Sequence, residues 1–198
     1  MKSPLRSMLV AIAAVVALSV VGTASASAHE FEYEIVGKFK RVSNTPQIFT
    51  TKAGGNVVEC TTDSVSGANP EGGANRKLHL EFAYSGCTVT VGGFPFPATV
   101  SSAKYLFNSE GTANLENTVT VSVPATGCKI TLPAQENLKP VTYENTPVKD
   151  VTFNLKFENA KSQGSINSEG KCVAGENTTG TYAGKTAIEE EGHSWDWK

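Results

Sequence analysis

Residues 77–91 read KLHLEFAYSGCTVTV, and this stretch decides the fold class. In its first half, the large apolar residues Leu78, Leu80, Phe82 and Tyr84 alternate with other positions, which include Lys77, His79 and Glu81. A period of two places alternate side chains on opposite faces of an extended chain, so that one face packs on a core and the other meets water. The stretch therefore predicts half-buried β structure and not an amphipathic helix.

The same alternation recurs along much of the chain, most clearly at residues 31–35, 119–123 and 151–157. Shorter strand-like runs occupy residues 47–51, 56–60, 87–91, 98–107, 128–132, 141–144 and 180–188. Turn-forming sequences separate these runs, at 53–56, 69–73, 92–93 and 108–111. No stretch shows a convincing helical period. Many short strands between turns predict an all-β, antiparallel β-sandwich, with a β-barrel as the alternative.

The first 28 residues have the features of an export signal. Lys2 and Arg6 precede an apolar stretch at 8–21, and small residues follow it up to Ala26 and Ala28. Signal peptidase needs small side chains at these last two positions, so we expect a cut after Ala28, although a cut after Ala26 also fits. The apolar run is shorter than the ~20 residues of a membrane span, which favours removal over anchoring. The sequence thus predicts a signal peptide at 1–28 and a secreted, extracellular product without a membrane span.

The remaining residues, 29–198, suit one all-β domain with enough length to bury a core. Without Lys2 and Arg6, 15 of the 17 basic residues oppose 19 acidic ones, which gives a net charge of −4. A mildly acidic surface gives no electrostatic reason to expect nucleic acid or an anionic membrane as partner.

All four cysteines lie in this predicted domain, namely Cys60, Cys87, Cys128 and Cys172. An even number of cysteines in an exported chain implies two disulfides. Four cysteines allow three pairings. The sequential pairing, Cys60–Cys87 and Cys128–Cys172, is favoured because each pair then flanks one compact group of strands. The spacing does not match a zinc site.

Two short segments echo each other, GCTVT at 86–90 and GCKIT at 127–131. In both, the cysteine shares a face with the apolar residues, so the cysteines are expected to point inward. The domain is interpreted either as two related halves or as a low-diversity β sequence in which the match is a coincidence.

A wider set of motifs resembles a family of secreted, β-rich, cysteine-containing proteins from soil-dwelling actinobacteria. The matching segments are AHEF at 28–31, QIFTTKAG at 47–54, VECTT at 58–62, YSGCT at 84–88, GCKIT at 127–131, VTYEN at 141–145 and GTYAGK at 180–185. The resemblance implies export and a β fold, and the family has no assigned activity. Members often carry further cysteines near 104–107 and 119–123, which this chain lacks.

His29 becomes the first residue if the signal is cut after Ala28. A free N-terminal histidine can bind copper through its amino group and ring, as in oxidative polysaccharide-cleaving enzymes, with a second histidine completing the site. Only His79 and His193 are available, and neither lies in a motif with ligand spacing. The alternative is that His29 is incidental to the cleavage site, and no cofactor is expected on balance.

Two pairs of aromatic residues are candidates for ligand contact. Trp195 and Trp197 lie on one face of an extended tail, where they either stack on sugars or clamp the last strand onto the core. Phe94 and Phe96 alternate with prolines, which predicts either an exposed contact surface or a loop folded over the core. For both pairs, the sequence favours packing on the core over contact with a ligand.

Catalytic motifs do not stand out in this sequence, which has no GxSxG elbow, HExxH pair or glycine-rich phosphate loop. The predicted function is therefore that of a secreted or envelope-associated, non-enzymatic β protein that binds a ligand or has a structural role. Its partner is not identified, and contact with the cell envelope or with glycans fits this setting. The alternatives are a carbohydrate-binding module using Trp195 and Trp197, and a copper protein using His29.

Overall fold

The computed structural model describes residues 30–33, 38–51, 56–68, 73–91, 94–145, 150–163, 177–190 and 195–198. All regular structure in these residues is β, which confirms the predicted class. The strands are β1 (Phe31–Tyr33), β2 (Lys38–Asn44), β3 (Gln47–Thr51), β4 (Val57–Ala68), β5 (Gly73–Asn75), β6 (Lys77–Val91), β7 (Phe94–Val100), β8 (Ala103–Asn108), β9 (Thr112–Leu115), β10 (Val119–Val123), β11 (Cys128–Leu132), β12 (Gln135–Leu138), β13 (Val141–Glu144), β14 (Asp150–Gln163), β15 (Asn177–Glu190) and β16 (Trp195–Trp197). The described residues contain no helix that could cross a membrane.

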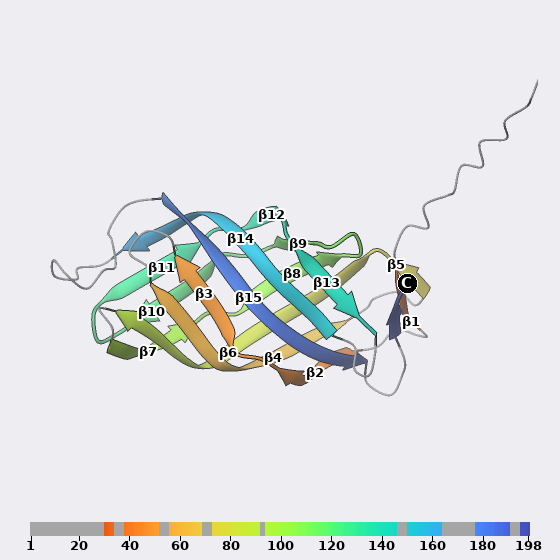
Figure 1. Cartoon of the computed structure of the whole chain (residues 1–198), viewed down its shortest axis with the longest axis horizontal. Helices are drawn as coiled ribbons and strands as arrows, with labels where there is room; N and C mark the ends of the chain where they lie inside the picture. The colour runs from red at the N-terminus through yellow and green to blue at the C-terminus, as the bar shows by residue number, and fades with distance from the viewer. Residues whose placement is uncertain are drawn as a thin grey trace, which may run out of the picture.

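The main sheet closes on itself. Its antiparallel pairings run β6–β7–β10–β11–β14–β15–β3–β4, and β4 pairs again with β6. Figure 1 shows the long strands β4, β6, β14 and β15 crossing the molecule obliquely around a shared interior. A closed path of this kind corresponds to the barrel alternative and not to the sandwich that the sequence favoured. Local alternation cannot separate the two, because both bury one face of each strand.

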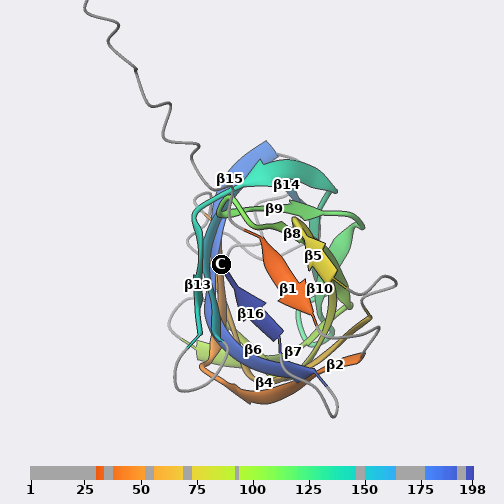
Figure 2. The same ribbon diagram turned by 90° about the vertical axis from the view of Figure 1, so that its right-hand side faces the viewer.

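A second, three-stranded sheet, with the order β16–β1–β5, lies across one end of the barrel (Figure 2). The backbones of Glu30 and Lys198 exchange two hydrogen bonds, at 2.6 and 2.8 Å. Phe31 of β1 is fully buried and meets the ring of Tyr143 edge to face at 5.0 Å. This end sheet therefore joins the first and last described strands and covers the core at that end.

Strand β6 is longer than the sequence suggested, because the predicted strands at 77–84 and 87–91 form one continuous element. Its first part pairs with β8 and its last part with β7, while β4 follows it on the other side. Gly86 lies between the two parts with φ 61°, a left-handed conformation that favours glycine. A Cβ atom here would lie 2.3 Å from the Thr61 hydroxyl, so glycine forms the bend at which β6 changes partner.

Several predicted strands match the structure closely, including those at 47–51, 119–123, 128–132 and 141–144. The predicted run at 98–107 is instead divided between β7 and β8. The glycines of the two similar segments, 86–90 and 127–131, have different positions in the fold. Gly86 lies at a bend within a strand, whereas Gly127 (φ 65°) lies in the turn between β10 and β11.

One disulfide is described, Cys60–Cys87, and it joins directly opposite residues of β4 and β6. Cys60, Cys87 and Cys128 are all buried, which confirms that these side chains point inward. No cysteine in the described part of the chain is free. Cys172 lies outside the described residues, so the second predicted pairing stays a prediction.

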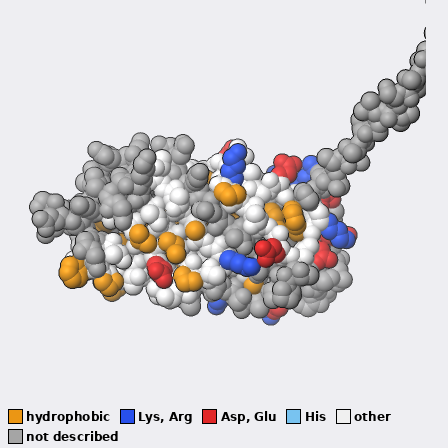
Figure 3. All heavy atoms as spheres, viewed as in Figure 1, with side chains coloured by type: hydrophobic (Ala, Val, Ile, Leu, Met, Phe, Trp, Pro, Cys, Tyr) orange, Lys and Arg blue, Asp and Glu red, His pale blue; other side chains and the backbone are white. Residues whose placement is uncertain are grey.

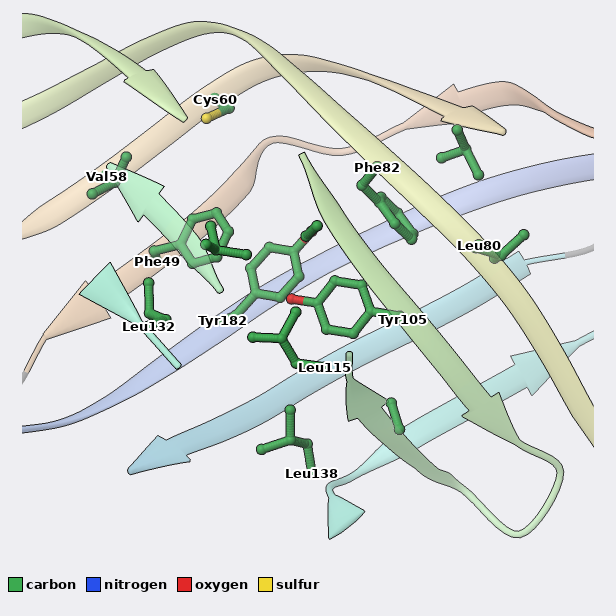
Figure 4. Packing of buried hydrophobic residues seen from close by; sticks show 14 of the residues in the cluster. Phe49, Val58, Cys60, Leu80, Phe82, Tyr105, Leu115, Leu132, Leu138 and Tyr182 are labelled. Atoms are coloured by element: carbon green, nitrogen blue, oxygen red, sulfur yellow. The ribbon is translucent and has the colours of Figure 1, made fainter. Parts of the chain in front are cut away.

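Aromatic side chains fill the middle of the barrel, where they approach from strands on several sides (Figure 4). Phe49 stacks on Tyr182 at 4.1 Å between ring centroids, and Tyr105 stacks on the same ring at 6.0 Å. The Tyr84 hydroxyl donates to that of Tyr182 (3.0 Å), which donates to the side-chain oxygen of the buried Gln47 (2.7 Å). The core thus contains one ordered chain of polar groups.

The hydroxyl of Tyr105 is buried and has no hydrogen-bond partner among the described residues. Burial raises the pKa of Tyr105 well above its usual value, with the nearby Tyr84 adding to the shift, so the phenol stays neutral. A buried hydroxyl without a partner destabilises the fold, whereas the hydrogen-bonded Tyr182 does not have this cost.

The cross-strand disulfide is expected to stabilise the barrel. Replacing both Cys60 and Cys87 by alanine releases a cross-link between residues 27 apart in sequence. The chain-entropy relation gives a loss of about 3–4 kcal/mol, which corresponds to a fall in Tm of roughly 6–16 °C for a chain of this size. Thermal unfolding followed by circular dichroism measures this, and an unchanged Tm would contradict it.

The two stacked tyrosines are expected to respond differently to removal of the hydroxyl. Tyr182→Phe leaves the Gln47 oxygen without its donor and costs roughly 1–3 kcal/mol. Tyr105→Phe removes a buried hydroxyl that has no described partner, so it is neutral or stabilising. Urea unfolding of both variants provides a matched comparison. An equal loss of stability in the two would show that Tyr105 is also hydrogen-bonded.

Candidate functional site

Two hollows lined by described residues are large enough for a small ligand. The first, of about 350 Å³, lies over β2, β4, β6 and β8 and is called the sheet hollow. Its lining residues are Lys38, Ser66, Gly67, His79, Leu80, Glu81, Lys104, Tyr105 and Glu116. His79 is exposed, as the alternation predicts, and its ring lies 3.6 Å from the Glu116 carboxylate.

The charges around the sheet hollow balance. Lys38 and Lys104 oppose Glu81 and Glu116, so the hollow attracts ligands of neither sign strongly when the histidine is neutral. The pair between His79 and Glu116 is about half exposed, and such pairs contribute little because solvent screens them.

The second hollow, of about 330 Å³, lies beside the turn between β8 and β9 and is called the turn hollow. Its lining residues are Arg76, Lys77, Asn108, Ser109, Glu110, Thr112, Asn114 and Asn137. All eight side chains are polar, and they come from the start of β6, the β8–β9 hairpin and strand β12. The lining thus consists of three amides, two hydroxyls, two cationic groups and one carboxylate.

A β-bulge shapes one wall of the turn hollow. The register of β12 against β9 shifts between Gln135 and Leu138, so two residues of β12 lie opposite the single residue Asn114. Asn137, in the bulge, has φ 56°, a left-handed conformation that asparagine tolerates better than most residues. The side-chain oxygen of Asn114 accepts the Asn137 backbone N–H at 3.0 Å. This contact fixes the orientation of the Asn114 amide.

The turn at 109–111 is held from two sides. The Ser109 carbonyl accepts the ring N–H of Trp197 (3.2 Å), and the Ser109 N–H donates to the Arg76 carbonyl (2.9 Å). Trp197, which belongs to the end sheet, therefore helps to hold the wall of the turn hollow in place.

Strand β13 holds the same hairpin through two further hydrogen bonds. The Tyr143 hydroxyl donates to the Asn108 carbonyl at 2.7 Å, and the Val141 N–H donates to the Gly111 carbonyl at 2.9 Å. Gly111 has φ 81°, and a Cβ atom there would lie 2.9 Å from the Val141 carbonyl oxygen. Glycine is thus required for β13 to approach the turn this closely.

The predicted tryptophan pair is not seen as a free platform. Trp197 is half-buried, packs on Tyr143 at 5.6 Å between ring centroids, and exchanges backbone hydrogen bonds with the Asn145 side chain. These contacts agree with the reading in which Trp197 clamps the last strand onto the core. The backbone of Trp195 pairs with Tyr33, and its side chain lies outside the described part.

Phe94 and Phe96 lie in strand β7 and not in the loop that the sequence favoured. Phe94 is 70% exposed, whereas Phe96 is half-buried against the core. Residues 94–97 pair with β6 on one side, and on the other side they have no partner strand among the described residues, because β10 begins to pair only at Thr99. Because proline has no N–H, Pro95 and Pro97 leave this free edge without donors, which discourages pairing with another chain.

His29 and His193, two of the candidate copper ligands, lie outside the described residues. Within the described ranges, no three His, Cys, Asp or Glu side chains come together as a metal site. The copper hypothesis therefore stays a prediction.

No protein-family model, curated protein or solved structure matches this chain. The resemblance to secreted actinobacterial proteins stays a prediction for the same reason. The turn hollow was not found from the sequence, where residues 108–111 were only a predicted turn. The sole signal for it is a group of asparagines around that turn, and such residues are common in turns.

The free edge of β7 is expected to protect the protein from self-association. Replacing Pro95 and Pro97 by threonine restores two N–H donors to this edge and should produce concentration-dependent dimers or larger species. Size-exclusion chromatography with light scattering measures the change. Pro124→Thr, in the exposed β10–β11 turn, is the control and should leave the mass distribution of the parent unchanged. A double variant that behaves like this control would contradict the role of the prolines.

Proposed function

We propose that this protein is an exported, non-enzymatic β-barrel domain that binds its ligand on the outer surface. The observation that carries the proposal is the filled interior of the closed sheet. Tyr105, Tyr182, Phe82 and Leu115 are almost completely buried and meet in the middle of the barrel (Figure 4). A ligand therefore finds its polar contacts in the surface hollows.

The closed sheet favours binding because it holds the surface residues in fixed positions. Sites on rigid elements lose less conformational entropy when a ligand binds. The turn hollow has the better-ordered lining, since hydrogen bonds from β13 and β16 hold its hairpin. Figure 3 shows hydrophobic side chains in small separate groups on one face of the molecule, which does not resemble a large apolar docking surface.

The two alternative functions gain unequal support. A carbohydrate-binding role is favoured by the amide-rich turn hollow, although Trp197 then serves as a support and not as a stacking platform. A copper role for His29 rests on the sequence pattern alone. The export step likewise rests on the predicted signal at 1–28.

The proposed function predicts saturable binding to material outside the cell. Protein recovered from the culture medium, and shown by N-terminal sequencing to begin at His29, should co-sediment with the insoluble envelope fraction of the producing cells. A variant with Lys104→Ala and Glu81→Gln tests the sheet hollow, and one with Arg76→Ala and Glu110→Gln tests the turn hollow. Loss of binding in either variant supports a surface site. If the protein remains in the supernatant at all concentrations, the proposed function is wrong.

A further inference from the structure

We propose that the turn hollow is a saccharide-binding site in which Asn108, Asn114 and Asn137 recognise hydroxyl groups. This inference rests on the proposed binding function and names the class of ligand. The volume of the hollow, about 330 Å³, falls within the ~300–1,000 Å³ that is usual for small-ligand sites.

The chemistry of the lining fits neutral hydroxyl groups. A sugar hydroxyl both donates and accepts hydrogen bonds, and an asparagine amide offers both functions on one planar group. Arg76 and Lys77 bring two positive charges to the lining, and Glu110 brings one negative charge. The Glu30 carboxylate lies 3.5 Å from the Arg76 guanidinium and offsets its charge, so the hollow does not strongly favour an ionic ligand.

The amides keep hydrogen-bonding capacity after their internal contacts are made. Asn108 donates from its side-chain nitrogen to the Thr112 hydroxyl at 2.9 Å, which leaves its side-chain oxygen as an acceptor. Asn114 uses its side-chain oxygen for the bulge, which leaves its NH₂ group as a donor. The Asn137 side chain makes no hydrogen bond to the described residues. Together they offer donors and acceptors from three different strand ends.

Ser109 adds a further observation. It lines the hollow and is 1% exposed, and its hydroxyl has no hydrogen-bond partner among the described residues. A buried polar group without a partner is rare in folded proteins, and a ligand hydroxyl in the hollow would supply one.

The geometry of the hollow is set before a ligand arrives. The bulge fixes Asn114 and Asn137 relative to each other, and the hairpin that carries Asn108 is fixed by Tyr143 and Trp197. Trp197 is therefore a positioning residue, whose ring N–H orients the turn and whose face packs on Tyr143. Preorganised polar groups bind more tightly because less side-chain freedom is lost.

Two substitutions test the site with little effect on the fold. Asn137→Gly removes the amide and retains the left-handed backbone conformation, which glycine adopts without strain. Asn114→Asp keeps the oxygen that accepts the Asn137 N–H and replaces the NH₂ donor by an acceptor. Thermal unfolding confirms that each variant is folded, and Lys129→Ala, at an exposed position of β11 that lines neither hollow, is the control.

The protein and its variants are screened on a glycan array and then titrated calorimetrically with cellohexaose, maltohexaose, xylohexaose, mannohexaose and chitohexaose. The unsubstituted protein should bind at least one glycan. Asn137→Gly and Asn114→Asp should each weaken that binding by about 3- to 10-fold, as expected for the loss of one hydrogen bond. Lys129→Ala should leave it unchanged.

Two results would overturn the inference: no binding to any glycan, or binding that both asparagine variants retain in full. The first result, together with saturable binding to the envelope fraction, leaves the proposed function intact and excludes the saccharide. Absence of both kinds of binding excludes the two proposals together.

Discussion

The pairing of β4 with β6 is the constraint on which the rest of the structure depends. It runs from Val57 to Gly67 on one strand and from Leu80 to Thr90 on the other, and it turns an open sheet into a closed one. The Cys60–Cys87 bond lies within this ladder. Closure removes the free edges that this pair of strands would otherwise expose, and it fixes which side chains face inward.

Closure also determines where a ligand can bind. The inward positions on the barrel strands carry large side chains, and the tyrosine and glutamine chain around Tyr182 orders the polar groups among them. Polar groups with remaining hydrogen-bonding capacity lie instead at strand ends, where bulges and turns interrupt the ladders. The turn hollow follows this rule, since the β12 bulge and the β8–β9 hairpin both form its wall.

The sequence predicts local features of this fold well and long-range features poorly. Alternation located strands such as those at 119–123 and 128–132, because the period of two is a property of each strand alone. The sequence does not predict the barrel over the sandwich, because closure depends on the register between β4 and β6, in which Cys60 lies opposite Cys87, and not on either segment by itself. Phe94 and Phe96 were expected in a loop because prolines flank them, yet a strand with one free edge accommodates prolines.

The candidate site was harder still to find from the sequence. Asn108, Asn114 and Asn137 are spread over 30 positions, and each is typical of a turn when taken alone. Only the bulge opposite Asn114 and the hairpin contacts bring the three amides to one hollow. Trp197, by contrast, is predicted from the sequence as a candidate contact residue, and in the structure its ring N–H donates to the Ser109 carbonyl of the neighbouring turn.

The end sheet pairs β1 with β16, so backbone hydrogen bonds hold the two ends of the described chain together. Phe31 is completely buried at this end, where its ring meets that of Tyr143. Proteolytic trimming before Trp195 removes the β16 partner of β1 and the contacts that Trp197 makes with Ser109 and Asn145. Such trimming therefore loosens this end of the barrel first, while the ladder between β4 and β6 keeps its own pairings.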